Sequence, residues 1–250
     1  MLLETEALVL RQINIVNGKK VLVLFTEKYG KISAYTSINL KTRSKAALSL
    51  KPFTVSRFEI YKNGDIYNIS YAETKQSYYT IGEDIDKYLA SSVILELTDK
   101  VIVEGEKQLE IYNLLKEFLQ EISKRKNEFK TLTIAYRVKV LDLLGYMPSI
   151  NYCAICKSEL KDCYISVREG NGICSECHSN IKTEDTASRL IFNANFDIVN
   201  IVKFFKNRPL LDLQKLKLEE KNAEFLEMFL KKYYEYHLGI SNLKSSEIVF

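Results

Sequence analysis

The fold of the first third of the chain is decided by residues 53–73, FTVSRFEIYKNGDIYNISYAE, which read as two strands around a tight turn. Aromatic and β-branched residues dominate both flanking runs, and such residues favour strands. The turn is Asn63-Gly64-Asp65. Asn and Gly both tolerate the positive φ angles that a tight hairpin requires. The stretch therefore predicts a β-hairpin.

Three further strand-like runs precede this hairpin, at residues 4–10 (ETEALVL), 21–26 (VLVLFT) and 31–36 (KISAYT). Turn residues separate them at Asn17-Gly18 and at Tyr29-Gly30. Roughly five strands without a long helix between them predict a small, closed or partly open barrel. The OB-fold is the commonest barrel of this size with a basic face, so we expect an OB-fold nucleic-acid-binding domain over residues 1–80.

Near residue 80 the apolar residues change to a helical spacing. We expect a first helix with one apolar face made of Ile81, Ile85, Leu89, Val93, Leu97 and Val101. Further helices are predicted over 109–124, 129–146, 194–206 and 219–238. The last is expected to bury a stripe formed by Phe225, Leu226, Phe229, Tyr233 and Tyr236, and to end at Gly239. The chain is thus predicted to be α+β, with a helical domain over 81–250.

The composition is that of an ordinary globular protein, with 46% hydrophobic and 27% charged residues and only 9 Gly and 3 Pro. The N-terminus MLLETEALVL has acidic residues where an export signal is basic, and no apolar run has the length of a membrane span. We therefore expect a cytoplasmic protein. P-loop, Rossmann and zincin motifs are absent from the sequence, and only two histidines occur. The sequence contains no catalytic constellation, which predicts a protein that is not an enzyme.

Two Cys-x-x-Cys pairs, Cys153/Cys156 and Cys174/Cys177, enclose a segment that can fold back on itself as a hairpin around Gly170-Asn171-Gly172. Cysteines in a reducing compartment favour a metal or redox role over disulfides. Four thiolates at this spacing are typical of a zinc ribbon. We therefore predict a structural Zn²⁺ bound by Cys153, Cys156, Cys174 and Cys177 in a module at about residues 150–182.

Other interpretations of the cysteines are weaker. A thioredoxin-like redox pair needs one such motif rather than two, and a catalytic zinc keeps an open position that four thiolates would close. A loop without metal, whose thiols simply pack, is the remaining alternative. Cys163 has no partner at ligand spacing and is expected to be a small packed residue. His178 could replace a ligand only if the turn slipped.

The net charge of +4 is unevenly distributed. Residues 1–80 carry 12 basic and 6 acidic residues, a net charge of +6, whereas the remainder carries 24 and 26, a net charge of −2. A localised basic excess favours polyanion binding, although a solvated lysine-rich surface would have the same composition. The candidate DNA-binding residues are Lys19, Lys20, Lys28, Lys31, Lys41, Arg43, Lys45, Lys51 and Arg57.

Aromatic residues alternate with these basic residues, and barrels hold single strands by combining phosphate contacts with base stacking. The aromatics in question are Phe25, Tyr29, Tyr35, Phe53, Phe58, Tyr61 and Tyr67. We expect about two-thirds of them to fill the barrel instead, because alternate strand positions point inward.

Five segments, in this order, resemble the RecO family of bacterial DNA-repair and recombination mediators. They are ETEALVLRQINIVNGKKVLVLFTEKYGKISAYT, SKAALSLKPFTVSRFEIYKNGDIYNISYAE, YRVKVLDLLGYMPSINYCAIC, GICSECH and YYEYHLGISNLKSSEIV. The resemblance runs nearly end to end. The family's loop that is usually glycine- and basic-rich reads here TSINLKTRSK, without glycine, so the geometry of its DNA contacts can differ.

The resemblance implies a protein that binds single- and double-stranded DNA, anneals complementary strands and works with RecR. In the family, this activity loads the recombinase RecA onto strands coated by single-stranded DNA-binding protein, without nucleotide hydrolysis and near the nucleoid. The family's zinc module is structural, and its helical domain binds the acidic C-terminal tail of single-stranded DNA-binding protein. Arg137 and Lys139 are candidates for that contact. A zinc-dependent enzyme and a zinc-containing scaffold that binds only proteins remain alternatives.

Overall fold

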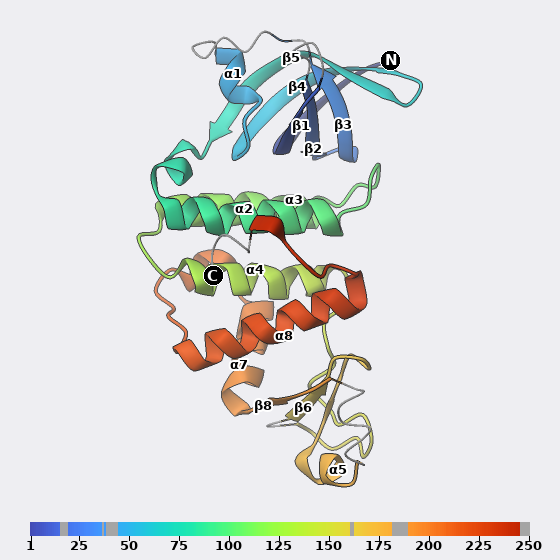
Figure 1. Cartoon of the computed structure of the whole chain (residues 1–250), viewed down its shortest axis with the longest axis vertical. Coiled ribbons are helices and arrows are strands. Elements are labelled where there is room, and N and C mark those ends of the chain that lie inside the picture. The colour runs from blue at the N-terminus through green and yellow to red at the C-terminus, as the bar shows by residue number, and fades with distance from the viewer. Residues whose placement is uncertain (16–19, 37, 39–44, 161–162, 182–189, 246–250) are drawn as a thin grey trace. The chain divides into compact units, whose positions relative to one another are not determined.

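The computed structural model describes residues 1–15, 20–36, 38, 45–160, 163–181 and 190–245 (Figure 1). The predicted turn at Asn17-Gly18 lies outside these residues. The chain forms two compact units, one made of Met1–Lys124 with Leu243–Phe250 and the other of Arg125–Asn242. Within the described residues, no helix combines the length and the apolar character that a membrane span requires.

The first unit contains a closed five-stranded barrel with the strand order β1-β2-β3-β5-β4. Neighbouring strands pair antiparallel, except for β3 and β5, which are parallel. The barrel closes where β4 pairs with β1. The predicted strands and the barrel are thereby confirmed. The strands are β1 (Leu2–Asn14), β2 (Lys20–Thr26), β3 (Gly30–Thr36), β4 (Thr54–Asn63) and β5 (Ile66–Ser77).

The barrel interior is apolar because alternate strand residues point inward. Leu22, Leu24, Phe58 and Ile60 are fully buried in this core. The hairpin between β4 and β5 turns at Gly64, whose φ of 57° is the positive angle that the Asn-Gly pattern predicts.

Helices complete the first unit. They are the short α1 (Lys45–Ser49), the 3₁₀ turn η2 (Tyr79–Glu83), α2 (Ile85–Val101) and α3 (Leu109–Lys124). The apolar face predicted for the first of the long helices is partly wrong: Ile81 lies in η2 and the side chain of Ile85 is 69% exposed. Residues spaced by four drift about 40° per step around a helix, so six of them cannot share one face.

The second unit combines helices with a small sheet of order β7-β6-β8. The strands are β6 (Cys163–Ser166), β7 (Asn171–Ile173) and β8 (Ile191–Ala194), and the helices are α4 (Phe129–Leu143), α5 (Ser175–Ser179), α7 (Phe196–Asn207), η3 (Leu210–Leu213) and α8 (Glu220–Leu238).

Helix α8 buries most of the aromatic stripe that the sequence predicts. Leu226, Phe229 and Tyr233 are buried, whereas Tyr236 is 49% exposed. The helix ends at Gly239, whose φ of 67° is the left-handed conformation of a C-cap. The predicted end is therefore confirmed, and the stripe is wrong at Tyr236.

The sequence change at residue 80 marks the end of the barrel strands rather than the edge of a compact unit. Helices α2 and α3 belong to the same unit as the barrel, and so does the C-terminal segment from Leu243. The boundary predicted between residues 1–80 and 81–250 was drawn from pattern alone and stays a prediction.

Candidate metal centre and nucleic-acid interface

The first cysteine pair lies in a tight turn that backbone hydrogen bonds close on both sides. The Cys153 N–H donates to Ser158 O at 2.8 Å, and the Lys157 N–H donates to Cys153 O at 3.0 Å. Lys157 has a φ of 63°, a left-handed angle that lets the chain reverse directly after Cys156. The turn thereby presents two thiols from one bend.

The second pair lies at the start of helix α5. Cys174 is the N-cap residue, and its Sγ accepts the Cys177 N–H at 3.4 Å. The hairpin of β6 and β7 carries this turn back beside the first pair, and the Cys174 N–H donates to Cys153 Sγ at 3.4 Å. The predicted hairpin is thus confirmed, but its turn lies at residues 167–170, because Asn171 and Gly172 already belong to β7.

The four Sγ atoms of Cys153, Cys156, Cys174 and Cys177 all lie within 4.8 Å of one another. Cys156 Sγ and Cys174 Sγ are 3.7 Å apart. Tetrahedral ligands about 2.3 Å from a zinc ion would lie about 3.8 Å from each other. The described part of the chain has no other group of His, Cys, Asp or Glu with this property, and these four cysteines could hold a metal ion.

The surroundings of Cys153 and Cys177 shift the pKa values of these two thiols in opposite directions. Burial opposes ionisation of Cys153, but N–H donors from Cys174, Cys156 and Ile155 outweigh it and lower its pKa to about 6. The hydrogen bond of Cys177 with Cys174, together with burial, raises the pKa of Cys177 to about 12. Adjacent thiolates repel one another, and a bound cation would offset that repulsion.

Neither Cys163 nor His178 belongs to the group of side chains that could hold a metal ion. Cys163 lies on β6, is 1% exposed and is not a member of the four-thiol group. His178 stacks on Tyr164 with ring centroids 3.7 Å apart. This agrees with the expectation that Cys163 is a packed residue.

The predicted DNA-binding residues of the barrel are dispersed, and several contact acceptors of the same unit. Arg57 forms an ion pair with Glu4 at 2.6 Å, and Lys28 Nζ donates to the Glu4 carbonyl oxygen at 3.2 Å. Lys31 Nζ donates to the Asp99 carbonyl oxygen at 2.5 Å, and its ion pair with the Asp99 carboxylate measures 3.4 Å. The charges of Arg57 and Lys31 are therefore partly neutralised within the protein, whereas, among the described residues, Lys28 donates only to a backbone carbonyl oxygen.

The other predicted DNA-binding residues form no ion pair among the described residues or lie outside them. Lys20 Nζ lies 3.4 Å from Gln12 Oε1, and Lys51 is exposed. Lys45 begins α1, but its side chain is not described. Lys19, Lys41 and Arg43 lie outside the described residues.

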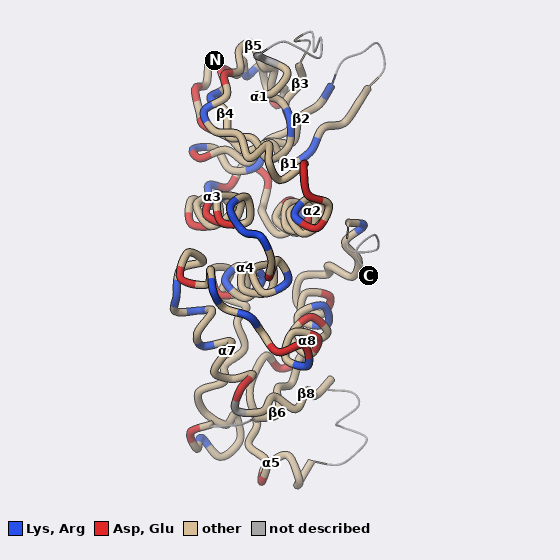
Figure 2. Tube along the Cα trace, turned by 90° about the vertical axis from the view of Figure 1, so that its left-hand side faces the viewer, with Lys and Arg blue, Asp and Glu red and all other residues tan. Residues whose placement is uncertain are grey.

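The outer face of β1, β4 and β5 is acidic. Glu4 lies opposite Glu59, and Arg57 lies between Glu6 and Glu73. Figure 2 shows basic and acidic residues close together on the barrel strands rather than one continuous basic face. The net charge of residues 1–80 includes these acidic residues, but it does not show that strand register places them beside the basic ones.

The aromatic residues behave as the alternation of strands predicts. Phe25 and Phe58 are fully buried, and Tyr29, Phe53 and Tyr67 are partly buried. Tyr35 and Tyr61 are 42% and 58% exposed. Five of the seven therefore belong at least partly to the interior, and two face solvent.

Comparison with known proteins decides the family. The model of the recombination protein O N-terminal domain matches residues 1–78, and that of the C-terminal domain matches residues 82–247. The chain belongs to the RecO family.

Similar curated RecO proteins align with nearly the whole chain. A protein of Alkaliphilus metalliredigens is 29% identical and the match covers 99% of this chain and 98% of the relative. A protein of Thermoanaerobacter sp. is 26% identical over 99% and 97%, and one of Desulforamulus reducens is 27% identical over 98% and 92%. All three are named DNA repair protein RecO.

Arg137 and Lys139, the candidates for a RecO-type peptide contact, both lie on α4. Arg137 packs on Tyr234, with its guanidinium carbon 5.8 Å from the ring centroid, and burial lowers the pKa of Arg137. Lys139 Nζ donates to the Lys206 carbonyl oxygen at 3.4 Å. Their role in binding a partner stays a prediction.

Proposed function

We propose that this RecO-family protein is a DNA-repair mediator that binds single- and double-stranded DNA and anneals complementary strands without being an enzyme. The observation that carries the proposal is the match of both RecO domain models, at residues 1–78 and 82–247. The names of the full-length relatives support a role in DNA repair.

The barrel is proposed to be an OB-fold that binds nucleic acid. A five-stranded, partly Greek-key barrel supports this assignment. The net charge of +6 in residues 1–80 supports binding of a polyanion. The ion pairs of Arg57 and Lys31 indicate that exposed cations such as Lys51 contribute more to the contact than the whole predicted set does.

The four-cysteine cluster is proposed to hold one structural Zn²⁺. A set of four thiols is the ligand set of closed zinc sites, in which no position remains for a water or substrate. The ion would supply the stability of a short excursion that is too small for a core of its own. It would take no part in DNA chemistry.

The partners proposed for the chain are RecR and the acidic C-terminal tail of single-stranded DNA-binding protein, with Arg137 and Lys139 as candidate contacts for the tail. Together with RecR, the protein would load RecA onto coated single strands. This assigns it to the cytoplasm, in association with the nucleoid.

The test is a strand-annealing assay with two complementary oligonucleotides that carry a donor and an acceptor fluorophore, without nucleotide, over a series of salt concentrations. We expect annealing that weakens as salt rises, because released counterions drive the binding. A pull-down with purified RecR is run in parallel. RecR capture without any binding to DNA at low salt would favour the protein scaffold instead.

A further inference from the structure

A groove in the first unit, distinct from the acidic outer face, contains features that suit a single-stranded nucleic acid. It has a volume of about 1090 Å³ and is lined by residues from β1, β3, β5, the α1–β4 connection, α2 and the C-terminal segment. Pockets for small molecules typically have about 300–1,000 Å³. The groove is as large as the largest of these pockets, so its size leaves room for an extended ligand.

The groove carries a net positive charge. Five basic and two acidic residues line it, and the basic ones are Arg11, Lys31, Lys51, Lys100 and Lys244. Both acids are engaged: Asp99 pairs with Arg11 at 2.6 Å, and Glu96 pairs with Lys100 at 3.2 Å. Lys51 and Lys244 are exposed, and neither forms an ion pair with a described residue. These two cations are available to phosphates.

Aromatic rings form one wall of the same groove. Tyr79 is 68% exposed and Tyr88 is 46% exposed. Phe53, which also lines the groove, meets Tyr88 edge to face with ring centroids 5.7 Å apart and so supports the Tyr88 ring. Exposed, supported rings next to cations are the arrangement on which single-stranded bases stack.

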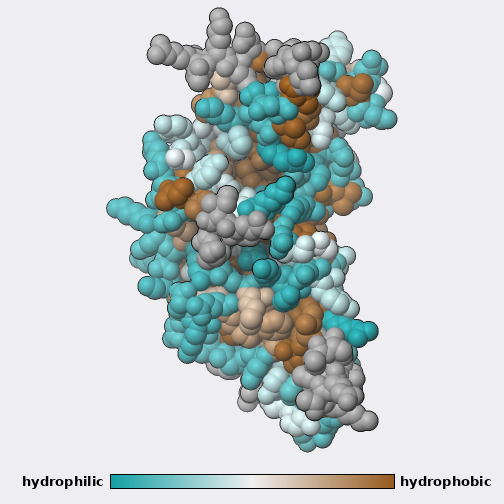
Figure 3. Space-filling model, in the orientation of Figure 1, coloured by the Kyte–Doolittle hydropathy of each residue, from teal (hydrophilic) through white to brown (hydrophobic). Residues whose placement is uncertain are grey.

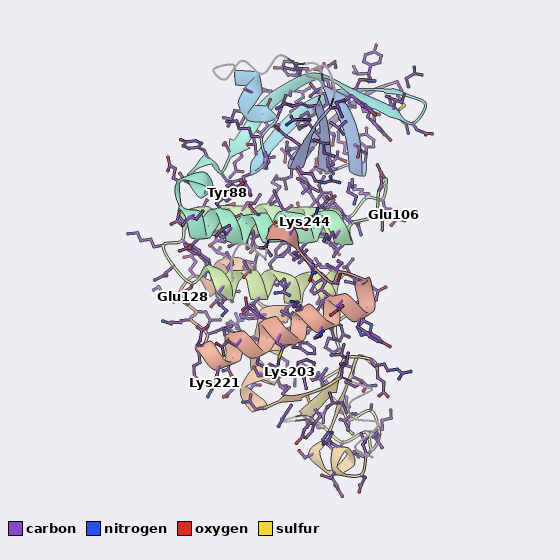
Figure 4. All side chains as sticks on the ribbon, in the orientation of Figure 1. Tyr88, Glu106, Glu128, Lys203, Lys221 and Lys244 are labelled. Carbon is purple, nitrogen blue, oxygen red and sulfur yellow. The ribbon has the colours of Figure 1, made fainter. Side chains whose placement is uncertain are left out.

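The surroundings of these rings are visible from one side. Figure 3 shows hydrophobic residues at the level between the barrel and α2, bordered by hydrophilic ones. In Figure 4, Tyr88 lies near the start of α2 and Lys244 lies on the C-terminal segment further along the same helix. The groove therefore offers ring surfaces at one end and a cation at the other.

We propose that this groove, through Tyr79, Tyr88, Lys51 and Lys244, is the seat of a single-stranded nucleic acid, a placement that rests on the proposed DNA-binding function. The bases of a duplex are already stacked on each other, so the rings can add little to duplex binding. An acidic peptide would satisfy the cations but would leave the rings without a planar partner.

The test uses the full-length chain and fluorescein-labelled oligo(dT), with binding followed by anisotropy. Tyr79→Ala with Tyr88→Ala should weaken binding by roughly 5- to 150-fold for each base that loses its ring. The matched pair Tyr79→Phe with Tyr88→Phe keeps the rings and should bind like the wild type. Duplex binding should change little in either pair.

The charge test is Lys51→Glu with Lys244→Glu, which should weaken binding and flatten the dependence of affinity on salt. The matched control is Lys203→Glu with Lys221→Glu in the second unit (Figure 4), which makes the same change in net charge. An equal loss in both pairs would mean that net charge alone acts, and the groove assignment would be wrong.

Photocrosslinking locates the strand independently of affinity. An oligonucleotide with 5-iododeoxyuridine should crosslink to peptides that contain Tyr79 or Tyr88. Crosslinks confined to other peptides, with wild-type affinity in the alanine pair, overturn the groove while the DNA-binding function stands. A wild-type chain that binds no strand overturns both. Binding of a fluorescein-labelled Asp-rich peptide is measured in the same way. If the variants lose binding to this peptide but still bind the strand, the groove is a peptide site instead.

Discussion

Gly30 lies where the chain leaves the turn after β2 and passes close to the loop that follows α2. Its φ is +68°, and a Cβ placed there would lie 2.0 Å from the Glu106 carbonyl oxygen. The Gly105 N–H also donates to the Lys31 carbonyl oxygen at 2.9 Å, which holds the two segments together. The position therefore needs glycine for two reasons, its backbone angle and the close approach.

Gly30→Ala should lower the free energy of unfolding of the first unit clearly more than Gly64→Ala. Gly64 has a φ of +57° and nothing within 4 Å of its Cβ position, so alanine there meets only the backbone strain of about 1–2 kcal/mol. Alanine at Gly30 meets the same strain plus a clash with backbone. Urea unfolding of both variants measures the difference, and equal losses would show that the loop moves aside freely.

Single residues also show why the charge pattern was only a partial guide. Lys31 and Arg57 belong to the predicted DNA-binding set. In the structure, however, Lys31 forms an ion pair with Asp99 at 3.4 Å, and Arg57 forms one with Glu4 at 2.6 Å. Asp99 lies in α2, outside residues 1–80, whose net charge favours polyanion binding. The sequence did not single out Tyr88 either, because its contact with Phe53 joins two segments that are far apart in the chain.

At the scale of elements, α2 begins with a side-chain cap. Asp84 Oδ1 accepts the N–H groups of Asp86 and Lys87 at 3.0 and 3.1 Å. These bonds satisfy two of the donors that the first turn of a helix leaves open.

Asp84→Ala should therefore lower the free energy of unfolding by about 1 kcal/mol. Asp84→Ser keeps an accepting oxygen and should recover most of that loss. Urea unfolding compares the two variants. If serine proves as destabilising as alanine, the contribution comes from the charge of Asp84 rather than from its capping bonds.

The four-cysteine module is the second element whose stability can be tested, because we expect it to depend on a bound metal ion. Purified protein should contain one zinc per chain, and Cys153→Ser should remove it. Cys163→Ala is the control, because Cys163 is buried nearby but lies outside the four-thiol group. It should keep the metal, as measured by atomic absorption.

Loss of zinc should raise amide hydrogen exchange first around residues 150–181 and leave the barrel protected. Binding to DNA should weaken only indirectly, because the groove and the basic residues belong to the other unit. Unchanged exchange in a metal-free Cys153→Ser variant would mean that the module folds without the ion.

At the scale of the whole molecule, the chain returns to its first unit at its end. The Lys244 N–H, the Ser245 N–H and the Ser245 hydroxyl all donate to the Glu96 carboxylate, at 3.0, 2.9 and 2.7 Å. Partial burial opposes ionisation of Glu96, but these donors and Lys100 outweigh it and lower its pKa to about 2. The anchored segment places Lys244 beside the groove.

This anchoring should be stable above pH 4.5, the ordinary pKa of a glutamate, and should be lost as the pH falls towards about 2. Ionisation of Glu96 stabilises the folded state, because the pKa of this carboxyl group is lower in the folded chain than in the unfolded one. A carbon-13 NMR titration should find Glu96 ionised at about pH 3.5, where a glutamate with its ordinary pKa is mostly protonated.

Ser245→Ala removes one donor and should raise the Glu96 pKa, whereas Ser179→Ala, in the second unit, should leave it unchanged. A Glu96 pKa near 4.5 in the wild type would contradict the anchoring.

The sequence by itself predicted the barrel strands, the long helices and the four cysteines that lie together. Strand alternation, the Asn63-Gly64 turn and the Cys-x-x-Cys spacing are local patterns, and each reports a backbone geometry that few residues set. The tertiary structure alone decided which helices join the barrel, that the C-terminal segment returns to Glu96, and which cations keep their charge available. These outcomes depend on residues far apart in the chain, such as Lys31 and Asp99, whose meeting is set by packing and strand register rather than by their neighbours in sequence.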